Sequence, residues 1–285
     1  MRLTGKGKIA GVVGWPISHS LSPVLHDYWL EELKLDGVLV PLAVRREEFA
    51  QTIVSLQQAG LRGVNVTVPH KEAAFALAHD CDEAARAASA ANLLIFRADG
   101  RIEARNTDAA GLMESVRISM GRLDGRSVLL LGAGGAARGA ILALNTLGAA
   151  RIELLNRHAD KAVMLARAMQ PLIKSELTAG GLEDWKRAAP AADLVINSTS
   201  AGMKGNPPLA LDLALLKPPA AVLDIVYNPL ETELLRAAKA RGHQTIDGLG
   251  MLMHQAAPSF EAFFGVKPDV TPGLRARLIE ALSHG

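Results

Sequence analysis

The stretch VLLLGAGGAARGAI, residues 128–141, restricts the fold of this chain more than any other part of the sequence. An apolar run ends at Gly132, small residues follow, and an alanine-rich segment comes next. Gly132, Gly134 and Ala137 fit the pattern G-x-G-x-x-A, which permits a tight turn and lets a pyrophosphate approach the start of a helix. Because strand, turn, helix and a second strand follow one another in order, we expect a Rossmann-type dinucleotide site. The alternative is a tight strand–helix turn that binds no ligand.

The end of the next expected strand indicates which dinucleotide is preferred. An NAD site usually carries an acidic residue about 20 residues after the glycines, where it binds the ribose. Glu153 has that spacing but lies inside the expected strand, and Asn156-Arg157 at its end carry no carboxylate. Arg157, with Lys161 one helical turn further on, can instead bind a 2′-phosphate. We therefore expect NADP as the cofactor; the alternative is a solvated basic helix start.

Short β-branched or leucine-rich runs alternate with longer amphipathic runs along the chain, which is typical of βαβ units and a mainly parallel sheet. A length of 285 residues favours two domains. The expected strands are residues 9–14, 38–44, 63–68, 92–96 and 101–105 in a first series, and 128–131, 152–156, 193–197, 221–227 and 244–246 in a second. The expected helices include residues 23–33, 46–59, 71–78, 109–121, 251–264 and 274–282.

Composition argues against several classes of protein. The formal net charge of +2 is too near zero to indicate binding to nucleic acid or to an anionic membrane. Cys81 is the only cysteine, so the chain can form no internal disulfide and has no cysteine metal motif, which suits a cytoplasmic protein. The histidines show no metal-ligand spacing, and we expect no metal. No apolar run approaches the ~18 residues of a membrane span, and the first 16 residues do not resemble a signal peptide.

Polar residues interrupt an otherwise apolar strand in NVTVPHKE, residues 65–72. Asn65 and Thr67 alternate with valines, Pro69 fits a first helical position, and Lys71 falls in the first turn of the helix. Open α/β sheets bind ligands at the carboxyl ends of their strands. Lys71 is therefore a candidate proton donor, the alternative being a lysine that extends into solvent.

A candidate partner for Lys71 comes from ARNTDAAGL, residues 104–112. If the strand ends align, Asp108 reaches Lys71, holds it charged and oriented, and joins it in binding a substrate hydroxyl. Asn92, at the start of another strand, adds an amide. The alternative is that Thr107 or Asp108 only caps the following helix.

Two serines precede the first helix in GWPISHSLSPVLHDYWL, residues 14–30. Hydroxyls at a strand–helix junction, here Ser20 and Ser22, can bind a carboxylate or a polyol. The alternative is structural, with Ser22 as N-cap and Pro23 as the first helical residue.

Taken together, the motifs resemble those of the shikimate dehydrogenases over nearly the whole chain. The matching blocks, in order, are GWPISHSLSPVLH, GVNVTVPHKEAAF, AANLLIF, NTDAAGL, GAGGAARGA, NR, INSTSAGM, DIVYNP and DGLGMLMHQAAPSFEAFFG. The resemblance implies reduction of 3-dehydroshikimate to shikimate with NADPH, on the path to aromatic amino acids. The implied fold class is α/β, with an N-terminal open α/β substrate domain and a C-terminal Rossmann-type NADP-binding domain. The implied limits are 1–108 with 248–285 for the first and 109–247 for the second.

The resemblance also implies roles for individual residues. Lys71 and Asp108 match the catalytic pair. The implied substrate contacts are Ser20, Ser22, Thr67, Asn92, Tyr227 and Gln255. The implied cofactor contacts are Gly132, Gly134, Gly135, Ala137, Asn156, Arg157, Lys161, Thr199, Gly248 and Met251.

This sequence departs from the family pattern at a few positions. His158 stands where threonine is usual, and Lys161 stands near the place of a later arginine, so we expect weaker or more pH-sensitive phosphate binding. Ala109 and Leu93 replace a common glycine and a common threonine, and neither change removes a polar catalytic group.

Several alternative functions stay open. A quinate/shikimate or aminoshikimate dehydrogenase has the same architecture, and a methylenetetrahydrofolate-type dehydrogenase shares the domain arrangement but gives no reason for the two serines. A catalytically silent NADP-binding sensor does not require both Lys71 and Asp108. We expect a small-molecule substrate, no nucleic-acid or membrane partner, and a monomer or homodimer.

Overall fold

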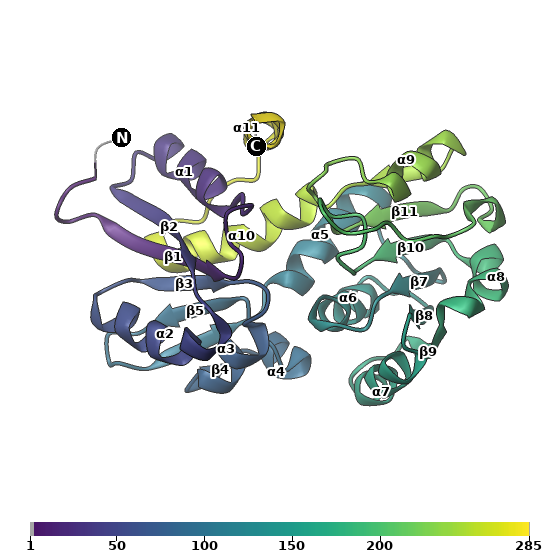
Figure 1. Ribbon diagram of the computed structural model, residues 1–285, viewed down its shortest axis with the longest axis horizontal. Coiled ribbons are helices and arrows are strands. Elements are labelled where there is room, and N and C mark those ends of the chain that lie inside the picture. Colours follow the sequence, from purple (N-terminus) through teal and green to yellow (C-terminus); the bar gives the residue numbers. More distant parts are fainter. Residues whose placement is uncertain (1–2, 285) are drawn as a thin grey trace. The chain divides into compact units, whose positions relative to one another are not determined.

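A computed structural model describes residues 3–284 and divides into two compact units (Figure 1). The first unit contains the chain up to Thr107 together with the chain from Met253 onward, and the second unit is Asp108–Leu252. The predicted limits of the functional domains, 1–108 with 248–285 and 109–247, remain a prediction. None of the helices within residues 3–284 combines the length and the apolar character that crossing a membrane requires.

The first unit contains a six-stranded mixed sheet in the order β2-β1-β3-β5-β6-β4. Its strands are β1 (Lys8–Gly14), β2 (Gly37–Ala43), β3 (Gly63–Val66), β4 (Asp80–Cys81), β5 (Leu93–Phe96) and β6 (Ile102–Arg105). β1 is parallel to β2 and β3, whereas β5 is antiparallel to β3 and to β6. β4 is parallel to β6, so five of the six strands run in one direction and β5 alone opposes them, which confirms the expectation of a mainly parallel sheet. β5 runs the other way because the short connection at Asp99-Gly100 joins it to β6, and a tight hairpin can join only antiparallel strands.

Helices cover both faces of this sheet (Figure 1). They are α1 (Ser22–Glu32), η1 (Arg46–Glu48), α2 (Phe49–Gln58), α3 (Lys71–Leu77), α4 (Glu83–Ala88), the part of α10 (Leu249–Phe264) that belongs to this unit, and α11 (Pro272–His284). Phe49, Ile53 and Ala74 from α2 and α3 form a core with Val64 and Val66 of β3.

On the opposite face of the sheet, α1 and α10 pack through aromatic rings. The rings of Trp29 and Phe260 lie 5.2 Å apart. Gly37 and Gly63 leave room for Phe264 and Phe263, since a Cβ at either glycine would lie 2.7 Å from the phenylalanine ring. Because side chains alternate along a strand, Asn65 faces this side of β3, opposite to Val64 and Val66.

The second unit contains a six-stranded, fully parallel sheet in the order β12-β11-β10-β7-β8-β9. Its strands are β7 (Ser127–Leu131), β8 (Arg151–Asn156), β9 (Glu176–Gly181), β10 (Leu194–Asn197), β11 (Ala221–Asp224) and β12 (Gln244–Ile246). With β7 as the first strand, this is the doubly wound order 3-2-1-4-5-6 of a Rossmann fold. The sequence does not predict β9, because ELTAGG has neither an apolar run nor a regular alternation.

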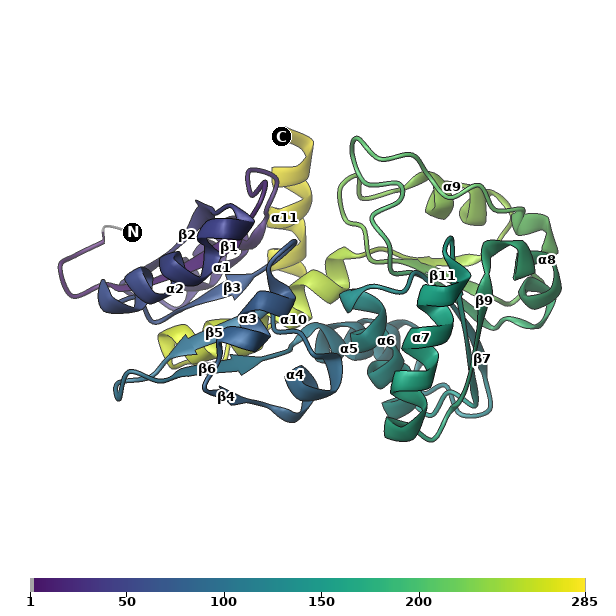
Figure 2. The same cartoon turned by 60° about the horizontal axis from the view of Figure 1, so that its bottom comes forward.

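Helices also cover both faces of the second sheet (Figures 1 and 2). They are α5 (Asp108–Met120), α6 (Gly135–Thr146), α7 (Ala159–Met169), α8 (Trp185–Ala188) and α9 (Glu233–Ala240), with the 3-10 turns η2 (Gln170–Leu172), η3 (Leu182–Asp184), η4 (Ala189–Ala191) and η5 (Leu213–Leu215). Leu130 belongs to the core on the α5–α7 side, and its neighbours Leu129 and Leu131 belong to the core on the α8–α9 side. A strand buried on both faces explains the continuous apolar run that precedes Gly132.

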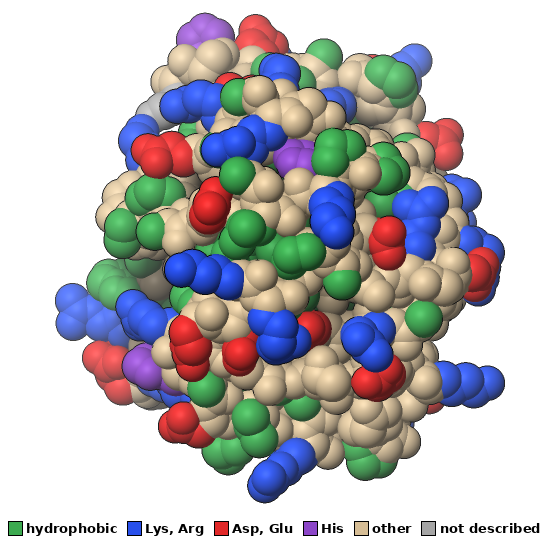
Figure 3. Space-filling view, turned by 90° about the vertical axis from the view of Figure 1, so that its right-hand side faces the viewer, with side chains coloured by type: hydrophobic (Ala, Val, Ile, Leu, Met, Phe, Trp, Pro, Cys, Tyr) green, Lys and Arg blue, Asp and Glu red, His purple; other side chains and the backbone are tan. Residues whose placement is uncertain are grey.

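Charged side chains are mixed on the surface that Figure 3 shows. Lysine and arginine are interspersed there with aspartate and glutamate, and the apolar side chains between them form small groups. This face therefore presents no continuous region of one sign, which agrees with a formal net charge of +2.

Candidate active site

The glycine-rich turn joins β7 to α6. Gly132 has φ +110°, and a Cβ there would lie 2.7 Å from Thr199 Cγ2 and 2.9 Å from Ser198 Oγ, so only glycine fits. Gly134 and Gly135, in contrast, have open space where a Cβ would stand. Gly134 is the N-cap of α6 and provides no side-chain cap, which leaves the first backbone N–H groups of the helix for an anion. This arrangement fits the pyrophosphate of NADP.

The second strand of this unit places the predicted phosphate-binding residues at its carboxyl end. β8 ends at Asn156, whose Nδ2 donates a hydrogen bond of 2.9 Å to the carbonyl oxygen of His158. Arg157 and Lys161 are exposed just beyond it. Two cations close to a strand end that has no carboxylate fit a 2′-phosphate better than a free ribose diol.

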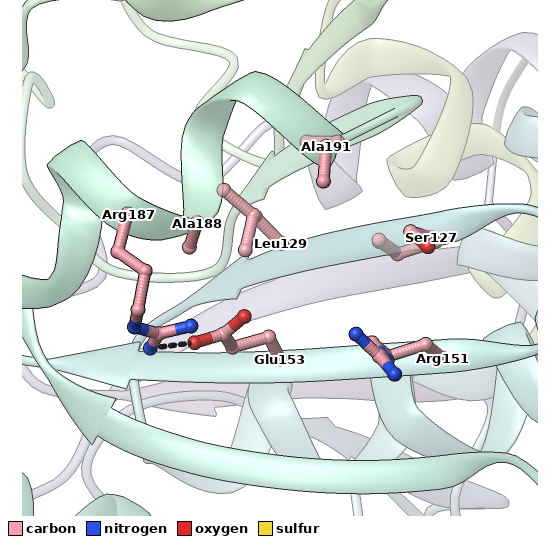
Figure 4. A pocket seen from close by; sticks show the side chains of 9 residues that line it. Ser127, Leu129, Arg151, Glu153, Arg187, Ala188 and Ala191 are labelled. Carbon is pink, nitrogen blue, oxygen red and sulfur yellow. Dashed lines mark hydrogen bonds and ion pairs between the residues drawn. The ribbon is translucent and has the colours of Figure 1, made fainter.

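Glu153 lies away from this strand end. It is buried within β8, and its carboxylate forms an ion pair with Arg187 of α8 (Figure 4). The pair borders a hollow of about 130 Å³ next to Ser127 and Arg151, the first residues of β7 and β8. The glycine turn follows the opposite ends of these strands, so this hollow is not the dinucleotide site. A larger hollow of about 440 Å³ lies between the loops after β10 and β11, with Gly202 and Asn228 in its lining.

Three polar residues of the first unit form one hydrogen-bonded group. Asn92 Nδ2 donates to Thr107 Oγ1 at 2.9 Å and to Gln255 Oε1 at 3.1 Å. Asn92 Oδ1 accepts from Thr107 N at 2.8 Å, and the Thr107 hydroxyl donates to the carbonyl oxygen of Gln255 at 2.7 Å. The structure thus brings together Asn92 and Gln255, both predicted substrate residues. The sequence suggests only a helix cap for Thr107. Apart from the polar residues beside it, nothing in the sequence indicates that Thr107 bonds to both Asn92 and Gln255.

Lys71 and Thr67 belong to the same region of the first unit. Lys71 begins α3, and its carbonyl oxygen accepts a hydrogen bond of 2.8 Å from Ala91 N, next to Asn92. Thr67 directly follows β3, and a Cβ at Gly14 would lie 2.5 Å from Thr67 Cγ2. Pro69 is not the first helical residue as expected; it lies in the turn before α3, after a cis peptide bond.

His70 connects the turn before α3 to the hydrophobic core. Its ring is fully buried, stacks on Phe49 at 4.7 Å, and has Nε2 2.8 Å from the carbonyl oxygen of Val44. These contacts connect the start of α3 to the core under β2 and α2, and they fix where the backbone of Lys71 begins its helix.

The two serines lie at the start of α1. Ser22 is buried and is the first residue of the helix rather than its N-cap, which is Leu21. The Ser22 N–H donates to Ser20 Oγ at 3.3 Å. The Ser20 hydroxyl therefore lies next to the backbone of Ser22 and satisfies one N–H group in the first turn of α1.

Asn65 of β3 contacts His26 in the aromatic layer between α1 and α10. Asn65 Nδ2 lies 3.4 Å from His26 Nε2, and the His26 ring lies 5.7 Å from that of Phe260. Complete burial lowers the pKa of His26 from 6.5 to about 3, so the ring is neutral at physiological pH.

Asp108 is the first residue of α5 and is buried next to Thr107. Asp108 belongs to the second unit and Lys71 to the first, and the contact between them stays a prediction.

The remaining predicted residues lie in the second unit. β11 ends at Asp224, so Tyr227 lies in the following loop and not at the end of the expected strand 221–227. Gly248 is required by packing, because a Cβ there would lie 2.2 Å from the carbonyl oxygen of Ile225. Met251 packs against the core formed by α5 and α6.

Three family models match successive parts of the chain. They are described as the shikimate dehydrogenase substrate binding domain (residues 12–94), shikimate / quinate 5-dehydrogenase (residues 114–204) and the shikimate 5′-dehydrogenase C-terminal domain (residues 248–276). A curated relative from Rhodospirillum rubrum, named shikimate dehydrogenase (NADP(+)), is 46% identical over 281 residues, which cover 97% of this chain and 99% of its own. This chain belongs to the shikimate dehydrogenase family. The predicted family and fold class are confirmed.

Solved structures with this fold include enzymes named for different substrates and solved with different cofactors. The enzyme of Thermus thermophilus, solved with NADP(H) and shikimate, has a TM-score of 0.84 at 32% identity and covers 97% of this chain and 99% of its own. A quinate dehydrogenase of Corynebacterium glutamicum, solved with NAD, has a TM-score of 0.87 at 28% identity with the same coverage. The fold alone therefore does not select the substrate, and the side chains must.

Proposed function

We propose that this protein is an NADP-dependent shikimate dehydrogenase that reduces 3-dehydroshikimate to shikimate with NADPH. The observation that carries the proposal is the 46% identity to a shikimate dehydrogenase (NADP(+)) over nearly the whole chain. The ion pair of Glu153 with Arg187, and the cations Arg157 and Lys161 beyond β8, support NADP in preference to NAD.

In this proposal Lys71 and Asp108 carry the proton chemistry. Bound NADPH supplies the hydride that reduces the ketone. Lys71 delivers a proton to the carbonyl oxygen and stabilises the negative charge that develops on it. Asp108 keeps Lys71 charged and orients it towards that oxygen. The position of Lys71 at the start of α3, next to the Asn92 segment, supports this assignment.

The substrate is bound, on this proposal, by polar groups of the first unit and by one residue of the second. Ser20 and Ser22 bind the carboxylate, and their proximity at the start of α1 supports a shared acceptor. Thr67, Asn92 and Gln255 bind the ring hydroxyls, and Tyr227 adds a further contact. The bonds among Asn92, Thr107 and Gln255 orient the amides before substrate arrives, so that little ordering is needed on binding.

The cofactor is held by the second unit. Gly132, Gly134, Gly135 and Ala137 accommodate the pyrophosphate, and Asn156, Arg157 and Lys161 bind the adenosine phosphate. Thr199, Gly248 and Met251 border the nicotinamide. We further propose that the protein acts in the cytoplasm as a monomer or homodimer; the single cysteine, Cys81, is compatible with a reducing compartment.

A spectrophotometric assay tests the function directly. Purified protein is given shikimate or quinate with NADP⁺ or NAD⁺, and reduction of the nucleotide is followed by absorbance. We expect the highest kcat/KM with shikimate and NADP⁺. Faster turnover of quinate with NAD⁺ would instead favour a quinate dehydrogenase, and binding of NADP⁺ without turnover of either acid would indicate a sensor.

A further inference from the structure

Asp224 is a fully buried carboxylate, 0% exposed, at the end of β11, and the proposed function does not use it. Burial raises the pKa of Asp224 to about 6, and hydrogen bonds from Val226, Thr232 and Asn197 oppose this rise. A buried charge destabilises a fold unless its partners compensate for lost hydration. The groups that contact the Asp224 carboxylate must therefore compensate for its lost hydration.

Three donors meet the Asp224 carboxylate. Oδ1 accepts from Asn197 Nδ2 at 2.9 Å and from Val226 N at 3.0 Å, and Oδ2 accepts from Thr232 Oγ1 at 2.7 Å. An ionised carboxylate only accepts hydrogen bonds, so it matches this set of donors. Asn197 is the last residue of β10, whereas Val226 and Thr232 both lie in the loop between β11 and α9.

The contact with Asn197 extends to Thr199, the residue proposed to border the nicotinamide. Asn197 ends β10 and pairs with Asp224 across the sheet. Its Oδ1 accepts from Thr199 N at 3.0 Å and from Thr199 Oγ1 at 2.7 Å, while its Nδ2 donates to Asp224 and to Ala201 O. Because Asp224 can only accept, it fixes which side of the Asn197 amide faces Thr199.

The other two contacts hold the segment that carries Tyr227. Val226 lies directly before Tyr227, and Thr232 ends the same loop. Thr232 is the N-cap of α9, where its Oγ1 also accepts from Leu235 N at 3.3 Å. One carboxylate therefore ties both ends of the 226–232 loop to the segment of Thr199.

We propose that Asp224 is a positioning residue that holds the Thr199 and Tyr227 segments in one fixed arrangement through Asn197, Val226 and Thr232. The inference rests on the proposed function, which assigns Thr199 to the cofactor and Tyr227 to the substrate. Asp224 itself touches neither ligand in this proposal; it acts through the residues that do.

The test is a direct titration of NADPH by fluorescence, which needs no turnover. Asp224→Asn keeps the shape and removes the charge, and we expect it to raise the Kd for NADPH about tenfold, as for the loss of one hydrogen bond. Asn197→Ala should do the same. Because both act on one chain of contacts, the double variant should bind about as weakly as either single variant.

Two further variants separate positioning from general structural damage. Asn197→Asp keeps the acceptors for Thr199 but replaces the donor to Asp224, and we expect weaker NADPH binding from it as well. Asp193→Asn is the matched control, since Asp193 Oδ2 also accepts a backbone bond, from Ser127 N at 2.8 Å, but precedes β10 at the other end of the sheet. It should leave the Kd unchanged.

Steady-state kinetics complete the test. The KM for shikimate should also rise about tenfold in Asp224→Asn, through the loop of Tyr227. An unchanged Kd for NADPH in Asp224→Asn and Asn197→Asp, additive effects in the double variant, or equal weakening by Asp193→Asn would overturn the inference. Failure of the wild-type protein to oxidise shikimate would overturn the proposed function instead, while the nucleotide titration would still report on Asp224.

Discussion

The side-chain amides of Asn92 and Gln255 are joined by a hydrogen bond of 3.1 Å, although 163 positions separate the two residues in the chain. Gln255 comes from α10, so the final part of the chain returns to the sheet formed by the beginning of the chain. The Thr107 hydroxyl accepts from the Asn92 amide and donates to the backbone carbonyl oxygen of Gln255. Two predicted substrate contacts therefore depend on a residue that contributes no predicted contact of its own.

Replacing Thr107 tests that dependence. Thr107→Val keeps the volume but removes the hydroxyl that donates to Gln255 O and accepts from Asn92 Nδ2. We expect kcat/KM for shikimate to fall about tenfold, since buried partners are left unpaired, with no change in KM for NADP⁺. The exposed Thr146→Val, on α6, serves as control. Unchanged kinetics in Thr107→Val would show that the amides do not need this support.

Removing Lys71 tests the catalytic assignment. General acid catalysis typically contributes about 10²–10⁴-fold to the rate, so Lys71→Ala should lower kcat by about that factor. The KM for NADPH should change little, because the nucleotide is bound by the second unit. Lys217→Ala, at an exposed position, should have normal kinetics. A near-normal kcat in Lys71→Ala would remove Lys71 from the mechanism.

The cofactor preference should depend on Arg157. On the proposed assignment, Arg157→Gln removes a charged donor to the 2′-phosphate, so the KM for NADP⁺ should rise roughly 10- to 100-fold while the KM for NAD⁺ stays the same. Glu153→Gln should leave the ratio of the two KM values unchanged, because Glu153 pairs with Arg187. A loss of preference in Glu153→Gln with none in Arg157→Gln would reverse the assignment.

Stability in acid should depend on His26. The pKa of His26 is about 3 in the folded protein and 6.5 in the unfolded chain. Between pH 3 and pH 6.5 the unfolded chain therefore binds the proton more readily than the folded protein does. Stability should therefore fall as pH decreases from about 6.5 to about 3, by as much as about 5 kcal/mol at 1.36 kcal/mol per pH unit. In His26→Leu, urea unfolding at pH 7.5 and pH 5 should differ less than in wild type, whereas the exposed His284→Leu should behave like wild type.

Asp224 should change the pH dependence of stability in the direction opposite to His26. Its pKa is raised from 3.8 to about 6, so the folded protein binds the proton more tightly, and this contribution to stability is lost as pH rises through about 6. The stability of Asp224→Asn relative to wild type should therefore increase between pH 4 and pH 7, by up to about 3 kcal/mol. Urea unfolding at both pH values measures this difference. A variant that is no less stable at neutral pH, yet binds NADPH more weakly, would separate positioning from folding.

The sequence predicts five of the six strands of the second unit, all but β9, because their patterns are local. The apolar run before Gly132, the glycines and the following alanines each specify one element, and together they specify the doubly wound sheet. Glu153 was correctly placed inside β8 for the same reason, since its position follows from the strand pattern alone.

The contacts that the sequence missed are long-range. The group formed by Asn92, Thr107 and Gln255 joins three separate segments, and no spacing along the chain indicates it. Asp224 lies in the quoted motif DIVYNP, but its contact with Asn197 is visible only once β10 and β11 are paired. The sequence places the start of the first helix one residue too late, at Pro23 instead of Ser22, and it gives Pro69 a helical position although Pro69 lies in the turn before α3.

The ion pair between Glu153 and Arg187 limits how this protein can be redesigned. Asn156 lies three residues beyond Glu153, about 10 Å along the strand, so the existing carboxylate cannot be redirected to a dinucleotide that lacks the extra phosphate. Shifting β8 by one residue would turn Leu154 and Leu155 to the wrong faces of the sheet. A variant designed to use NAD must therefore carry a new acidic residue at position 156 or 157 and keep Glu153 in place.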